Sequence, residues 1–161
     1  MAQEDRQREP VTPAVGDATD DPFSELFLPF LRLFEGIRDH EKLFPKECRV
    51  CGKTFGSYPE YVRDTFPKGH VLEDCSDVMK RALTMTYRHC GCGNTLILTF
   101  TDEVLRALDE LWAMLRQEAE LTGKPLRQVV KEFGRQCDRY IVSRFESSAG
   151  SAAEHLYGDT V

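Results

Sequence analysis

The sequence of 161 residues has no run of about 18 consecutive apolar residues, the minimum for a helix that crosses a bilayer. Residues 1–10 are highly polar, so they also lack the apolar core of a secretory signal peptide. We therefore expect a cytoplasmic protein with no membrane partner. In that reducing compartment, clustered cysteines bind metal more often than they form disulfides.

The usual signatures of catalysis are missing as well. The chain has no Gly-x-Ser-x-Gly elbow, no Walker phosphate loop, no His-Glu-x-x-His helix and no Gly-x-Gly-x-x-Gly fingerprint. Acidic residues are plentiful, but no pair of them stands apart from ordinary surface charge. The sequence therefore favours a protein that is not an enzyme.

A uniform positive charge is absent too, because the net charge is −6. Residues 1–21 carry six acidic and two basic side chains and two prolines, which predicts a disordered acidic tail. Residues 124–144 carry six basic and two acidic side chains. The acidic total argues against a protein that coats nucleic acid over its whole surface, but it leaves room for one local basic face.

Residues 22–146 are expected to form a single zinc-binding domain of the α+β class, mainly helical, followed by a flexible tail at 147–161. Asp21 and Pro22 make a good helix start, and Pro29 must kink this helix or mark a second start. Four phenylalanines then follow at spacings of four, three and four residues, which places them on one helical face. This aromatic face predicts either a helix buried in its own domain or a surface for dimerisation or docking. Its members are Phe23, Phe27, Phe30 and Phe34.

Apolar and polar residues alternate over 83–88 and again over 96–100, on either side of a turn at 89–94. This pattern predicts a two-stranded β-hairpin. Short helices are expected before it, at 59–66 and 74–82. Residues 102–146 carry two apolar stripes of helical period joined by a short connection, which predicts an antiparallel helix pair.

Two glycine-containing cysteine motifs carry the chemistry: Cys48-Arg-Val-Cys51-Gly and Cys90-Gly-Cys92-Gly. A Cys-x-x-Cys turn lets two thiolates converge on one ion, and glycine permits the positive φ that such a turn requires. Four thiolates complete the tetrahedral sphere of Zn²⁺ and leave no open position, so we expect a structural ion. Iron or an iron–sulfur cluster also uses four thiolates and stays an alternative, as do disulfides and a redox motif.

These motifs, with the hairpin around the second one, resemble zinc ribbons and zinc knuckles over roughly residues 48–100. The resemblance implies metal binding and a small β element. It departs from the simplest ribbon because the second pair is Cys-x-Cys and because 38 residues, 52–89, separate the two motifs.

A basic side chain recurs at every fourth residue of the last predicted helix. The residues are Arg127, Lys131, Arg135 and Arg139. This stripe predicts a solvated face, or alternatively a surface that binds nucleic acid or another anion, with Arg49, Lys53 and Arg88 as further contributors. The same three basic side chains are near the cysteine motifs in sequence, so we expect them to offset the charge of the thiolates.

The remaining cysteines and histidines have weaker patterns. Cys137 lies on an apolar stripe and is interpreted as core, and Cys75 as a free thiol. His70 and Cys75 could together supply at most half of a second metal site. His89 directly precedes Cys90, and it is either a non-ligand or a ligand in place of Cys90 or Cys92.

The leading functional hypothesis is a zinc-binding adaptor or regulatory protein that acts through a protein partner or homo-oligomer. Two alternatives stay open: a nucleic-acid-binding transcriptional regulator that uses the basic helix, and a switch that responds to oxidation or metal.

Overall fold

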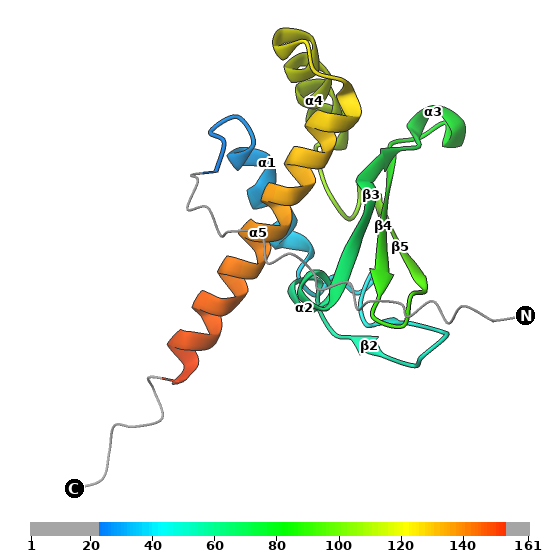
Figure 1. The fold of residues 1–161 in the computed structure, drawn as a ribbon, viewed down its shortest axis with the longest axis vertical. Helices are drawn as coiled ribbons and strands as arrows, with labels where there is room; N and C mark the ends of the chain where they lie inside the picture. The colour runs from blue at the N-terminus through cyan, green and yellow to red at the C-terminus, as the bar shows by residue number, and fades with distance from the viewer. Residues whose placement is uncertain (1–22, 154–161) are drawn as a thin grey trace, which may run out of the picture.

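The computed structural model describes residues 23–153 and has an α+β fold (Figure 1). The predicted acidic tail at 1–21 and residues 154–161 lie outside the described part. In chain order the elements are α1 (Leu28–Leu33), the 3₁₀ helix η1 (Phe34–Ile37), β1 (Lys46–Glu47), β2 (Thr54–Phe55), α2 (Tyr58–Asp64), β3 (Thr65–Asp74), α3 (Ser76–Met79), β4 (Leu83–Cys90), β5 (Thr95–Thr101), α4 (Leu108–Thr122) and α5 (Leu126–Ala153).

Two small antiparallel sheets are present among the described residues. One has the strand order β3-β4-β5, and the other contains β1 and β2 only. The long helix α5 runs beside the larger sheet and packs against β3, α2 and α4 (Figure 1). The predicted hairpin is confirmed as β4 and β5, which pair from Leu83 opposite Thr101 to His89 opposite Thr95.

The sequence prediction missed the third strand, β3, and assigned its ends to helices. The strand contains Pro67 and Gly69, two residue types that are disfavoured inside strands. The strand accommodates both residues because it lies at the edge of the sheet and because its register with β4 shifts between Pro67 and Leu72. Of the two short helices expected around it, α2 occupies most of 59–66, and α3 is a single turn.

The core-facing side of β4 is the polar one. Thr84, Thr86 and Arg88 are buried, whereas Met85 and Tyr87 lie half-buried on the opposite face. The buried hydroxyl of Thr84 has a hydrogen-bond partner, because the indole Nε1 of Trp112 on α4 donates to it over 2.8 Å. On β5 the apolar residues face the core instead: Leu96, Leu98 and Phe100.

The aromatic N-terminal segment packs into its own domain. Pro29 stands in the first turn of α1, so it marks a helix start, and the residues just before it form a turn. The Phe27 ring lies 5.3 Å from that of Phe133 on α5, edge to face, and Phe34 lies 5.8 Å from Phe100 on β5. Both Phe27 and Phe34 are buried, so they present no surface to a partner.

The predicted pair of C-terminal helices is present with different boundaries. Thr101 accepts hydrogen bonds from the backbone of residues 104 and 105, but this turn stops, and α4 begins only after Ala107 at φ +67°. Gly123 ends α4 at φ +69°, as expected for a C-cap. Helix α5 passes the predicted domain end at 146 and continues to Ala153.

One buried arginine joins three elements. Arg88 on β4 donates through Nε to the Thr65 hydroxyl over 2.6 Å and through Nη2 to the carbonyl oxygens of Val62 and Thr65, each over 3.0 Å. Its Nη1 forms an ion pair with Asp138 on α5 over 2.7 Å. Burial raises the pKa of the Asp138 carboxyl, and the guanidinium opposes that rise. Arg88 therefore acts as an internal tie and is not available to a nucleic acid.

The Asp138→Asn variant tests this tie. It removes the counter-charge of a buried guanidinium while keeping the side-chain size, so the free energy of unfolding is expected to fall by about 2–3 kcal/mol. The matched Asp39→Asn change alters an exposed residue and should stay within about 0.5 kcal/mol of wild type. Urea denaturation measures both, and equal effects of the two variants would contradict the assigned role.

Candidate metal centre

The first cysteine pair occupies the turn between β1 and β2. The backbone N–H of Cys48 donates to the carbonyl of Lys53, and the N–H of Gly52 donates back to the carbonyl of Cys48, each over 2.8 Å. Gly52 has φ +76°, which residues with a Cβ rarely adopt. The chain thus folds back on itself and directs Cys48 and Cys51 toward the same side.

The second pair repeats this pattern at the tip of the β4–β5 hairpin. The N–H of Cys90 donates to the carbonyl of Asn94, and the N–H of Gly93 donates to the carbonyl of Cys90, again over 2.8 Å. Gly93 has φ +91°. Each turn therefore positions its two cysteines by the same pair of backbone hydrogen bonds and one left-handed glycine.

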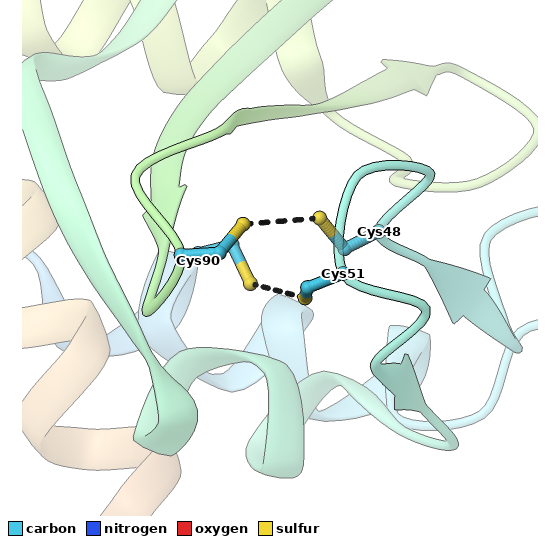
Figure 2. Close-up of side chains that lie close together, drawn as sticks. Cys48, Cys51 and Cys90 are labelled. Atoms are coloured by element: carbon cyan, nitrogen blue, oxygen red, sulfur yellow. Dashed lines mark hydrogen bonds between the residues drawn. The ribbon is translucent and has the colours of Figure 1, made fainter.

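The two turns bring all four sulfur atoms together, so the predicted cluster is confirmed (Figure 2). The Sγ atoms of Cys48 and Cys92 lie 3.6 Å apart, as do those of Cys51 and Cys90, and all four lie within 4.8 Å of one another. Four sulfurs at about 2.3 Å from one tetrahedral ion are about 3.8 Å apart. A disulfide needs a separation near 2.05 Å, so no pair is bonded.

The electrostatics of the cluster favour a bound cation. The backbone N–H of Cys51 and the amide of Asn94 donate to the Cys48 sulfur and lower the pKa of Cys48 to about 6. The backbone N–H of Lys53 likewise lowers the pKa of Cys51. Contacts with the sulfur of Cys90 and with the other sulfurs outweigh this effect and raise the pKa of Cys51 to about 11. Sulfurs this close do not all ionise unless a positive ion lies between them.

One side of the cluster is buried in the protein, and the other side is exposed to solvent. Cys48 and Cys90 are buried, at 0% and 2% exposure, whereas Cys51 and Cys92 are exposed. Lys53, expected to offset thiolate charge, forms an ion pair with Asp64 instead, over 3.3 Å. Arg88 is likewise engaged elsewhere.

Two further contacts fix the first turn to the body of the protein. Phe55, which follows the turn, is fully buried, and its ring lies 5.5 Å from that of Tyr61. Lys46, which precedes the turn, donates to the carbonyl of Ile97 on β5 over 2.8 Å. Neither contact was predicted, because neither partner is near in sequence. Asn94 was also missed, although an asparagine inside a cysteine turn is a readable signal for a hydrogen bond to sulfur.

Among the candidate ligands whose side chains are described, only the four cysteines belong to the cluster. His89 is half-buried, and Cys75 donates only to the carbonyl of Glu73, over 3.8 Å; neither belongs to the four-sulfur group. The side chain of His70 falls outside the described residues. Cys137 is buried, as predicted, and burial raises the pKa of its thiol well above the usual value.

The four residues of the predicted basic stripe differ in their exposure and contacts. Arg127 and Lys131 are exposed on α5. Arg135 forms an ion pair with Glu132 over 2.7 Å, and the guanidinium of Arg139 lies 4.5 Å above the ring of Phe23. The four residues do not present one uninterrupted cationic surface.

No protein-family model matches the chain, and no curated protein or solved structure matches it either. Among the described residues, no helix is both long enough and apolar enough to cross a membrane. The chemistry of the site is therefore argued from its own geometry.

Substituting one sulfur tests the cluster. The Cys90→Ser variant leaves three thiolates and removes a buried sulfur of the cluster, so any bound metal is expected to fall from about one ion per chain to near zero. Amide hydrogen exchange should then accelerate in residues 46–55 and 90–95. The Cys75→Ser variant removes a cysteine outside the cluster and should keep both the metal and the protection. Elemental analysis of the purified proteins measures the first effect, and a Cys90→Ser protein with full metal content would contradict the site.

Proposed function

We propose that this protein is a non-catalytic adaptor or regulatory protein in which a zinc-stapled hairpin holds a protein-interaction surface in shape. The observation that carries the proposal is the convergence of four cysteine sulfurs from two separate turns within 4.8 Å. Four protein ligands fill a tetrahedral sphere, and a filled sphere suits a structural ion better than a reactive one.

The spacing of the sulfurs supports a single ion. A cluster of several irons keeps its cysteine ligands farther apart than one shared ion does, because the ligands bind different irons. The pairs at 3.6 Å match the edge of a tetrahedron around one Zn²⁺. This spacing supports the zinc-knuckle arrangement that the resemblance implies.

The metal would stabilise a part of the fold that is weak without it. Strands β1 and β2 have two residues each, and isolated two-stranded hairpins are marginal in water. An ion that joins this hairpin to the tip of β4 and β5 couples metal binding to local folding.

The surface for a partner is best placed on the outer face of the β3-β4-β5 sheet, which we call the outer sheet face. It carries Phe66 at 60% exposure and Ile97 at 43%, together with half-buried Met85 and Tyr87. Tyr87 lies directly opposite Ile97 in the register. Exposed apolar residues on a sheet face are typical of protein interaction sites. Of the aromatic face predicted at Phe23–Phe34, Phe27 and Phe34 are buried, and Phe23 and Phe30 are half-buried.

The Ile97→Lys variant tests the outer sheet face. It places a charge in the patch at an exposed position, so recovery of the bound protein is expected to fall about tenfold or more. The measurement is affinity purification of the tagged protein from its native cells with mass spectrometry, with zinc measured on the same sample. Light scattering on the purified protein detects self-association.

The matched control is Val78→Lys, which makes the same kind of change at an 82% exposed residue on α3. This variant should recover the partner as wild type does. A wild-type protein that is strictly monomeric and recovers no partner would contradict the adaptor function, even with the zinc in place.

A switch that responds to oxidation is the second candidate, and the exposure of Cys51 and Cys92 favours it. One hydrogen peroxide and two protons convert these two thiolates to a disulfide and two waters, which leaves the ion two ligands short. A mild dose of peroxide is expected to release zinc to a chromogenic chelator, and dithiothreitol with added zinc should reverse the loss. Retention of zinc under a large molar excess of peroxide would contradict the switch, and only the structural role of the ion would remain.

A further inference from the structure

A small cavity lies between β4 and α5, at the buried tie between these two elements. Thr86 and Arg88 line it from β4, and Gly134, Cys137 and Asp138 line it from α5. Its volume is about 10 Å³. A single water molecule needs a space of roughly 10–15 Å³ by this kind of measure, and every organic ligand needs more. The size of the cavity therefore suits one water molecule.

The hydroxyl of Thr86 needs a partner in this cavity. Thr86 is 3% exposed, and its Oγ1 forms no hydrogen bond with a described residue. Tyr61 lies nearby: burial raises the pKa of its hydroxyl to about 12, and Arg88 and Thr86 oppose that rise. The two hydroxyls do not reach hydrogen-bond geometry, however, so both are unpartnered within the described part of the chain. Burying a hydroxyl without any hydrogen bond is unfavourable.

Arg88 brings an unused donor to the same cavity. A guanidinium group carries five N–H groups, and four of those on Arg88 donate within the protein. Nε donates to Thr65, Nη1 to Asp138, and Nη2 to the carbonyl oxygens of Val62 and Thr65. The second N–H of Nη1 has no acceptor among the described residues. Because the charged group is buried, leaving this N–H unpaired is costly.

Asp138 supplies a free acceptor and faces solvent. Its Oδ2 accepts from Arg88, and its other carboxylate oxygen forms no hydrogen bond with a described residue. The side chain is 20% exposed, and it also lines the larger cavity along α5, so it lies between the small cavity and solvent. The charges of Arg88 and Asp138 balance each other. The site therefore favours a neutral molecule that both donates and accepts hydrogen bonds over an ion of either sign.

We propose that one water molecule binds in this cavity as a structural component of the tie between β4 and α5. The water accepts from the remaining Nη1 N–H of Arg88 and donates to the Asp138 carboxylate and to the Thr86 hydroxyl. Three protein partners are typical of a buried water. No cysteine of the metal centre lines this site, so the inference does not rest on the proposed function.

A crystal structure of the full-length protein, at a resolution that shows ordered solvent, tests the site directly. A density peak is expected within hydrogen-bond distance, about 2.6–3.2 Å, of both Thr86 Oγ1 and the Asp138 carboxylate. A folded wild-type protein without a peak at this position would overturn the proposal.

Two threonine variants provide a matched pair in solution. Thr86→Val keeps the side-chain shape and removes the hydroxyl from the cavity, and Thr99→Val makes the same change at a half-buried residue of β5 that does not line it. Oxygen-17 magnetic relaxation dispersion counts long-lived internal water molecules. The count is expected to fall by about one in Thr86→Val and to stay at the wild-type value in Thr99→Val. An unchanged count in Thr86→Val, or equal losses in both variants, would contradict the assignment, and the wild-type crystal structure decides the matter if Thr86→Val does not fold.

Discussion

The fold depends on two turns that must meet at one point. Residues 48–53 and 90–94 belong to different sheets, and their sulfur atoms come within 4.8 Å. Phe55 anchors one strand of the smaller hairpin in the core, Lys46 ties the other strand to β5, and Lys53 pairs with Asp64 on α2. Thiolates crowded in this way repel one another once ionised, so a cation between them converts a repulsive arrangement into a stabilising one.

The second constraint is the inward-facing polar side of β4. Thr84 accepts from Trp112 and Arg88 binds Asp138, so the strand exchanges apolar burial for specific contacts with α4 and α5. Such contacts stabilise only one relative placement of strand and helix, because a shifted register would leave a buried guanidinium unpaired. The same strand ends at Cys90, so one element positions both the internal tie and half of the sulfur cluster.

Features that depend on neighbouring residues were predictable from the sequence. Period-two alternation identified the β4–β5 hairpin, and glycine spacing identified the two cysteine turns. Features that depend on distant partners were not. Strand β3 contains Pro67 and Gly69, which indicate a loop when read locally, and a sheet edge tolerates them only because β4 is present. Arg88 gives no sign of its partner, which lies 50 residues away.

The aromatic N-terminal segment illustrates the same limit. Its spacing predicted either a buried helix or a docking surface, and the choice depended on Phe133, a residue about a hundred positions later. Once α5 covers Phe27 and Phe34, the exposed apolar residues that remain on the sheet lie on its outer face, around Ile97. The interaction surface proposed for the protein is thus determined by tertiary packing that no local pattern encodes.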